Sequence, residues 1–360
     1  MSVDEAAAGT TSRAAAALRL VAINLVVCLV LASLPELAAV LLMRFPAPLT
    51  GHALRVFRQY YASHDRQIIQ LLPDCAVYDP ELTYLLRPPG CRIVNREHTV
   101  DYVVNRLGAR DDEGSLDGPE IIVLGDSQAM GWGVGQTQTF SELLERETGS
   151  RVLNLAISSY GTVRELKLLD RADRSRLKTL VIQYCQNDAP ENLAFESEGN
   201  RLPISDRAVY EKTVEDYLAR TAYSPWKHTR RLVQIWRHLG APWAPPDTVE
   251  EHLVDARAFL NALAESGIDL GGIEIVVFEV NGFARNDAYF TTALESTVEQ
   301  LPPESPWRRV QVLDLSPELT EDKYYKIDDH LTAEGHRTIA DALLPLLQAS
   351  FPSNEPEPRP

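Results

Sequence analysis

The chain has 360 residues and a formal net charge of −16, from 35 Lys and Arg against 51 Asp and Glu. Basic side chains supply most nucleic-acid affinity by neutralising phosphates, so we expect no nucleic-acid partner. Hydrophobic residues at 45% and charged residues at 24% are ordinary globular values, which excludes disorder over most of the chain. Four cysteines are too few for a disulfide-built scaffold, and their spacing fits no zinc site.

An apolar stretch at residues 20–43 predicts a helix that spans a membrane. Only Asn24, Ser33, Pro35 and Glu36 interrupt it. As a helix it would be about 36 Å long, enough to cross a hydrocarbon core of about 30 Å. We expect residues 1–19 to form a cytoplasmic tail before this single-pass anchor. A cleaved signal peptide and a buried core helix are the alternatives.

Basic residues flank the apolar stretch on both sides, so the positive-inside rule does not decide its orientation. They are Arg13 and Arg19 before it, and Arg44, Arg55 and Arg58 after it.

Residues 44–115 are expected to form a juxtamembrane, irregular lead-in. Within it, Cys75 and Cys91 lie in a Pro- and Gly-rich stretch. A disulfide between them would indicate an oxidising compartment outside the cytoplasm. Two unpaired cysteines are the alternative.

Residues 116–350 predict an α/β domain, because short apolar runs typical of buried parallel strands alternate with helical segments. The expected strands are 121–124, 152–155, 180–184, 275–278 and 310–313. The expected helices are 140–147, 162–172, 249–264 and 332–347. This alternation favours a doubly wound, mostly parallel sheet of five strands with helices on both faces.

Residues 195–247 interrupt the alternation with two helical segments, 206–220 and 226–238, and a Pro-rich stretch. We interpret them as a helical insertion, which could serve as a lid or acceptor-binding cap or simply as a packing appendage. The Pro- and Glu-rich tail, 351–360, is expected to be disordered.

Polar motifs follow three of the expected strands, and a fourth precedes the last helix. They are Gly125-Asp126-Ser127, Asn154 to Gly161, Gln186-Asn187-Asp188 and Asp328-Asp329-His330. A serine at the carboxyl end of a strand is well placed to act as a nucleophile. Each motif alone could equally cap a turn or a helix. A metal cluster of Asp328, Asp329, His330 and His336 lacks a second ligand group, so we expect neither a metal nor a cofactor.

Together and in this order, the four motifs resemble the blocks of the GDSL/SGNH hydrolase family over roughly residues 76–350. Met130 to Val134 and Asn105 to Arg110 also resemble segments of bacterial membrane-anchored members. The resemblance implies a flavodoxin-like three-layer fold and a serine esterase. It implies that Ser127 is the nucleophile, that His330 is the general base and that a carboxylate orients the imidazole. The oxyanion would be held by the Ser127 N–H, a backbone N–H of the second block and the Asn187 amide.

The chain departs from the family pattern at two positions. The family's commoner spacing puts the orienting aspartate three residues before the histidine, where this chain has Ile327. We therefore expect Asp328, and not the adjacent Asp329, to orient His330. The family's oxyanion glycine aligns with Ser159, and Gly161 remains the alternative donor.

The sequence and the resemblance define the expected reaction better than they define the substrate. The resemblance and the anchor favour an esterase that acts on O-acetyl or other O-acyl groups of cell-envelope or exported polysaccharide, with its domain in the periplasm. The first alternative is an O-acyltransferase that moves the acyl group onto a polysaccharide hydroxyl. The second is a non-catalytic, membrane-anchored subunit that binds polysaccharide.

Overall fold

The structure is a computed structural model that describes residues 3–239, 248–284 and 287–350. The chain divides into two compact units, Met1–Ser63 with Ala222–Ala241 and His64–Thr221 with Pro242–Pro360. The expected insertion at 195–247 is therefore shared between the units. The Pro-rich stretch at 240–247 and the tail at 351–360 lie outside the described residues.

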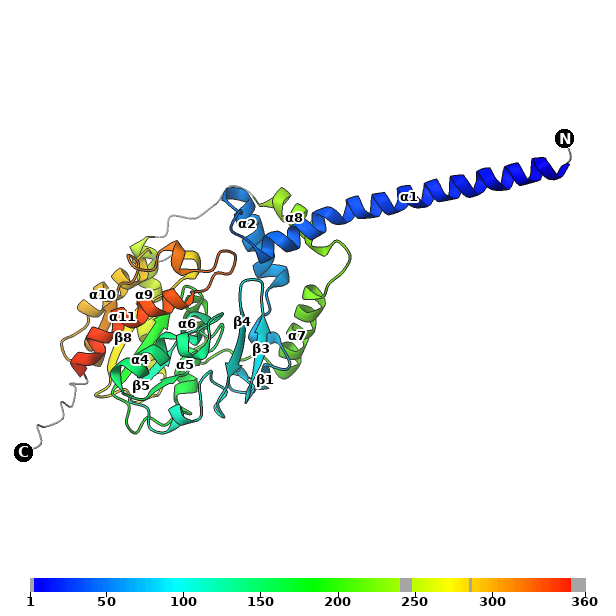
Figure 1. Ribbon diagram of the computed structural model, residues 1–360. Coiled ribbons are helices and arrows are strands. Elements are labelled where there is room, and N and C mark those ends of the chain that lie inside the picture. The colour runs from blue at the N-terminus through cyan, green and yellow to red at the C-terminus, as the bar shows by residue number, and fades with distance from the viewer. Residues whose placement is uncertain (1–2, 240–247, 285–286, 351–360) are drawn as a thin grey trace, which may run out of the picture. The chain divides into compact units, whose positions relative to one another are not determined.

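Three α-helices make up most of the described part of the first unit, and they are labelled in Figure 1. They are α1 (Val3–Arg44), α2 (Gly51–Tyr60) and α8 (Lys227–His238). Among the described residues, only the Ala15–Arg44 part of α1 is long and apolar enough to cross a membrane, with a mean hydropathy of 2.5. The helix begins at Val3, so most of the expected separate tail continues the same helix.

Polar contacts hold the three helices of this unit together. Glu36 of α1 accepts hydrogen bonds from the backbone N–H groups of His228 (3.2 Å) and Thr229 (2.8 Å), at the start of α8. This carboxylate therefore caps the helix, because the first turn of a helix has N–H groups without partners. Tyr60 of α2 lies 2.6 Å from His228 Nδ1, which joins α2 to α8.

A parallel five-stranded sheet forms the centre of the second unit. Its strands are β5 (Ile121–Leu124), β6 (Val152–Asn154), β7 (Thr179–Tyr184), β8 (Glu274–Glu279) and β9 (Val310–Leu313). Their order is β6-β5-β7-β8-β9, and every neighbouring pair is parallel. The predicted doubly wound α/β fold is confirmed.

Helices cover the sheet in two groups. The first group is α4 (Phe140–Thr148) and α11 (Ala333–Ser350), which pack against each other. The second is α5 (Thr162–Leu169), α6 (Asp188–Ser197), α9 (Val249–Glu265) and α10 (Tyr289–Glu299). All four residues of β5 are fully buried, as expected for a strand covered on both faces.

Local sequence signals explain where several of these helices start and stop. Thr248 and Glu251 form a reciprocal capping box at the start of α9. Thr139 accepts a hydrogen bond from the Glu142 N–H at the start of α4, and Gly149 ends that helix in a left-handed conformation.

The lead-in segment is more regular than the sequence indicated. It contains two antiparallel hairpins, made by β1 (Ala76–Asp79) with β2 (Thr83–Leu86) and by β3 (Gly90–Val94) with β4 (Thr99–Val103). The expectation of an irregular segment was wrong here, because these strands are four or five residues long and their alternation is too brief to stand out.

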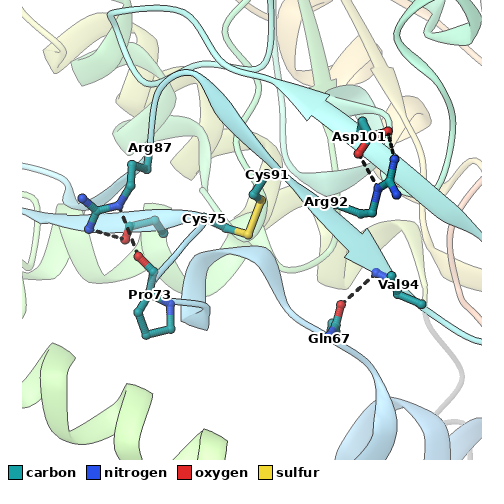
Figure 2. Close-up of a disulfide and its surroundings, with 9 residues drawn as sticks. Gln67, Pro73, Cys75, Arg87, Cys91, Arg92, Val94 and Asp101 are labelled. Atoms are coloured by element: carbon teal, nitrogen blue, oxygen red, sulfur yellow. Dashed lines mark hydrogen bonds and ion pairs between the residues drawn. A yellow bond between two sulfur atoms is a disulfide. The ribbon is translucent and has the colours of Figure 1, made fainter.

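A disulfide joins Cys75, just before β1, to Cys91 in β3, with a Cα–Cα distance of 5.4 Å (Figure 2). It therefore connects the first hairpin to the second. Arg92 and Asp101 form an ion pair across the second hairpin, and the Gln67 side chain accepts a hydrogen bond from the Val94 N–H. Cys28 and Cys185 are free.

Replacing both bridged cysteines by serine should lower the free energy of unfolding by about 3 kcal/mol, because a loop of this length loses much closure entropy when cross-linked. Urea unfolding of the full-length chain in detergent, followed by near-UV circular dichroism, measures the change. Cys28→Ser is the control and should leave the midpoint unchanged. Equal midpoints for the oxidised and the reduced wild-type protein would contradict a stabilising role.

Candidate active site

Ser127 lies at a sharp turn between β5 and the short helix α3 (Ser127–Met130). Asp126 caps this helix by accepting a hydrogen bond from the Gln128 N–H at 2.8 Å. Gly125 has φ = +150°, and a Cβ at this position would lie 2.6 Å from the Ala129 Cβ. The turn therefore requires glycine, and it leaves the Ser127 side chain half-buried beside a pocket.

Two glutamine side chains fix the turn. Gln183 of β7 accepts hydrogen bonds from the N–H groups of Asp126 (3.2 Å) and Ala129 (3.1 Å). Gln128, next to the nucleophile candidate, donates to the Asp329 carbonyl at 2.9 Å and accepts from the Leu331 N–H at 3.2 Å. The serine turn and the loop before α11 are thus joined directly.

Ser127, His330 and Asp328 form a continuous chain of hydrogen-bonding contacts. Ser127 Oγ lies 2.7 Å from His330 Nε2, and His330 Nδ1 lies 2.5 Å from Asp328 Oδ1. In this arrangement the imidazole can accept the serine proton while the carboxylate fixes its tautomer. The structure thus brings together the three residues predicted for this purpose.

The Asp328 side chain is fully buried and surrounded by donors. Its Oδ2 lies 3.2 Å from Trp132 Nε1 and 3.3 Å from His98 Nε2. Burial opposes ionisation, but His330, His98 and the Arg66 guanidinium hold the pKa of Asp328 well below its usual range. The carboxylate is therefore ionised, as an orienting group must be.

Glu97 positions the backbone that carries Asp328. Its carboxylate accepts hydrogen bonds from the N–H groups of Lys326 (2.8 Å), Ile327 (2.8 Å) and Asp328 (2.9 Å). Glu97 and His98 both lie in the connection between β3 and β4, so the second hairpin holds the triad carboxylate from two sides.

Asp329 lies closer to Arg66 than Asp328 does. It forms an ion pair with Arg66, and its Oδ1 lies 3.1 Å from His330 Nδ1, farther than that of Asp328. Its side chain is 35% exposed, whereas that of Asp328 is fully buried. Burial raises the pKa of Asp329, but Arg66 and His330 together lower it to about 2. This geometry favours Asp328 as the orienting carboxylate.

Both carboxylates act on the imidazole. Burial alone would lower the pKa of His330, but the charges of Asp328 and Asp329 raise it to about 9. A general base must be neutral to accept a proton. Catalysis through His330 would therefore increase as the pH rises toward that value.

A pocket of about 240 Å³ opens beside Ser127 and His330. Ser159 and Asn187, the predicted oxyanion donors, both line it. Within the described residues, the backbone N–H groups of Ser127 and Ser159 have no acceptor. The Asn187 amide donates to Asp126 Oδ2 at 3.1 Å, which leaves its second N–H available.

Ser159 has the left-handed φ of +62°, which is uncommon outside glycine and is often found at functional sites. The Gln70 side-chain amide donates a hydrogen bond to the Ser159 hydroxyl at 2.8 Å. The Tyr84 hydroxyl donates to the Ser158 carbonyl at 2.6 Å. Gly161, the alternative donor, does not line the pocket, and its N–H is hydrogen-bonded to Glu191. The geometry favours Ser159 over Gly161.

Helix α7 (Arg207–Thr221), the first part of the expected insertion, braces the pocket wall. Tyr210 donates to the Gln70 carbonyl, and Tyr217 donates to the Arg66 carbonyl, both at 2.9 Å. Tyr217 also accepts from the Ile68 N–H at 3.0 Å. The helix thus fixes the segment whose residues Arg66, Ile68 and Gln70 line the pocket.

The Arg110 side chain supports the segment that follows Ser127. It is fully buried, lies 4.4 Å from the Tyr102 ring centroid and donates to the carbonyls of Met130, Gly131 and Val134. Burial lowers the pKa of this guanidinium.

Asp328, Asp329 and His330 are close enough to one another to hold a metal ion. Their geometry fits a triad better, because Asp328 is hydrogen-bonded to His330 and Asp329 is paired with Arg66. His336, considered with them, accepts a hydrogen bond from the Phe140 N–H. Burial lowers the pKa of His336 to about 3.

Sequence reasoning did not identify Glu97, His98, Arg66 and Gln128 as parts of the site. All four lie more than 200 positions from their partners, so spacing could not have revealed them. The strands on either side of residues 95–98 are too short to mark a hairpin in the sequence, so the turn that carries Glu97 and His98 left no clear signal.

Asp328→Asn should reduce ester turnover by about 10³–10⁴-fold at every pH, because the imidazole loses its orienting anion. Asp329→Asn should retain most of the turnover. Removing its charge lowers the pKa of His330, so the acid limb of the kcat/KM profile should move to lower pH. Asp101→Asn, an exposed carboxylate of the second hairpin, is the control. A larger loss with Asp329→Asn than with Asp328→Asn would reassign the triad.

Neither a scan against protein-family models nor a search of curated proteins found a match. Among solved structures, a carbohydrate acetylesterase family member from Sinorhizobium meliloti is 13% identical, covering 64% of this chain and 99% of its own, with a TM-score of 0.34. A candidate lipolytic protein of the G-D-S-L family from Desulfitobacterium hafniense is 12% identical, covering 63% and 98%, with a TM-score of 0.34. A family two carbohydrate esterase from Clostridium thermocellum is 12% identical, covering 65% of each chain, with a TM-score of 0.39. The structural neighbours of this chain are thus GDSL/SGNH lipolytic proteins and carbohydrate esterases, matched at low identity.

Proposed function

We propose that this protein is a serine hydrolase that cleaves carboxylic esters through an acyl-enzyme on Ser127. The observation that carries the proposal is the hydrogen-bonded chain of Ser127, His330 and Asp328 at the edge of an open pocket. A buried ionised carboxylate, an imidazole and a hydroxyl in this order are the groups that acyl transfer needs.

The proposed reaction has two half-reactions. His330 takes the Ser127 proton as the oxygen attacks the ester carbonyl, and it returns that proton to the leaving alcohol. Water then attacks the acyl-enzyme with His330 again as base, which releases the carboxylic acid and regenerates the serine. The N–H groups of Ser127 and Ser159 and the Asn187 amide would hold the negative oxygen in both steps.

We propose a short acyl group, such as acetyl, on a carbohydrate. The pocket of about 240 Å³ is small, and hydrophilic side chains, including Arg66, Gln70 and Asn187, make up much of its lining. A small space suits a short acyl chain, and polar groups suit a hydroxyl-rich alcohol.

We propose further that α1 anchors the protein in a membrane, with the α/β domain in an oxidising compartment such as the periplasm. Glu36, within the apolar stretch, caps α8, and Trp226 donates to the Ala32 carbonyl at 3.1 Å. These contacts make α1 part of the folded protein, which argues against removal as a signal peptide. The Cys75–Cys91 disulfide supports the proposal of an oxidising compartment, because disulfides persist there.

Purified full-length protein should hydrolyse p-nitrophenyl acetate and react with a fluorophosphonate probe. Ser127→Ala and His330→Ala should do neither, while their circular dichroism spectra match that of the wild type. Turnover should fall from acetate to octanoate esters if the pocket limits acyl length. Full activity in Ser127→Ala would refute the proposed mechanism.

Asn187→Ala should lower kcat by about 10²–10³-fold with little change in KM, because an oxyanion donor acts mainly in the transition state. Gln186→Ala, at the adjacent exposed position, is the matched control and should stay close to wild type. A change confined to KM would instead indicate a role in substrate binding.

An acylated oligosaccharide product would identify an acyltransferase. Mass spectrometry of reactions that contain candidate oligosaccharides and an acetyl ester donor detects it. The Ser127→Ala variant is the blank, and free acetate as the sole product supports the hydrolase.

Full-length protein should remain with membranes after carbonate extraction, since α1 would cross the bilayer. A reporter fused after residue 60 should be active outside the cytoplasm. An extractable protein that retains residues 1–44 would contradict the anchor.

A further inference from the structure

Two segments of the first unit, both outside the apolar stretch of α1, have an unusual charge. Residues 44–63 and 222–239, which together contain α2 and α8, include seven Lys or Arg and no Asp or Glu, although the whole chain carries a net charge of −16. The seven are Arg44, Arg55, Arg58, Lys227, Arg230, Arg231 and Arg237. A basic concentration of this kind in an acidic protein selects for an anionic partner.

Most of these basic side chains are accessible. Arg44, Arg230, Arg231 and Arg237 are exposed, Arg55 and Arg58 are half-buried, and Lys227 is buried. Exposed aromatic residues accompany them: Tyr223 at 67%, Trp226 at 40% and Trp236 at 52%. Basic residues mixed with Trp and Tyr are typical of helices that lie in the headgroup region of a membrane.

Contacts with α1 place these residues along its C-terminal third. The Trp226 indole donates a hydrogen bond to the Ala32 carbonyl, and the Glu36 carboxylate caps α8. The apolar stretch begins at Leu20, well before both positions. At 1.5 Å per residue, Glu36 lies about 24 Å beyond Leu20, which is near the far boundary of a hydrocarbon core of about 30 Å. In an inserted α1, the start of α8 would therefore lie at the membrane interface.

An open hollow of about 440 Å³ lies where α1 meets the segment before α8. Leu37 and Val40 of α1 line it together with Tyr223, Pro225 and Trp226, and the polar residues Ser33 and Glu36 complete the lining. Its apolar part suits the upper end of a lipid acyl chain, and Arg230 and Arg231 of α8 follow Trp226 within five positions.

We propose that residues 44–63 and 222–239, the basic collar, bind the headgroups of anionic phospholipids on the side of the membrane where the α/β domain lies. The proposal rests on the membrane insertion of α1 and is independent of the ester chemistry. It also gives these arginines a role on a side where the positive-inside rule would not place them.

The test uses full-length protein in phosphatidylcholine nanodiscs that contain a small fraction of phospholipid brominated on its acyl chains, which quenches nearby tryptophans. Brominated phosphatidylglycerol should quench at least fivefold more than brominated phosphatidylcholine at the same mole fraction, and 0.5 M NaCl should remove the difference. A Trp226→Phe/Trp236→Phe variant assigns the quenching to the basic collar. Protein that fails to enter nanodiscs would contradict the anchor.

Charge variants decide the inference. Each basic residue near an anionic surface contributes about fivefold to association, so R230Q/R231Q/R237Q should lose most of the phosphatidylglycerol preference. R230K/R231K/R237K should keep it. R92Q/R106Q/R207Q removes three arginines of the other unit, each with a 64% exposed side chain, and should also keep it. Equal quenching by both lipids in wild-type protein, or an equal loss in the control triple variant, would overturn the proposal.

Discussion

The burial of one ionised carboxylate, that of Asp328, constrains the surroundings of the site. A carboxylate removed from water is costly unless other donors replace its hydration. Here the donors come from His98 in the second hairpin, Trp132 after the serine turn and His330 before the last helix. Three segments far apart in the sequence must therefore converge on the Asp328 carboxylate, and the pocket beside Ser127 forms where they meet.

Much of the fold and the three residues of the candidate triad could be predicted from the sequence. The strands of the sheet are short continuous apolar runs, a signal that survives because both faces of the sheet are covered. Parallel strands place their carboxyl ends at one edge, so polar motifs after β5 and β7 had to lie close together. For this reason the sequence alone places Ser127 and Asn187 near each other.

The supporting residues could not be predicted, because their roles depend on contacts that leave no periodic pattern. Glu97 accepts three backbone N–H groups more than 200 positions away, and Arg66 pairs with Asp329 across a similar separation. The basic collar is a related case. Neither of its two segments stands out alone, and only the docking of α8 against α1 and α2 shows that their seven basic residues belong to one region.

The disulfide has a consequence for the candidate triad. Cys91 lies in β3, directly opposite Tyr102 of β4, and the connection between these strands presents Glu97 and His98 to Asp328. The same hairpin contacts the serine turn, because Tyr102 accepts a hydrogen bond from the Gly133 N–H. Chains whose two thiols are still reduced hold this hairpin by noncovalent contacts alone. Reducing the bridge therefore removes the covalent restraint on the hairpin that positions Asp328, although both cysteines lie outside the lining of the pocket beside Ser127.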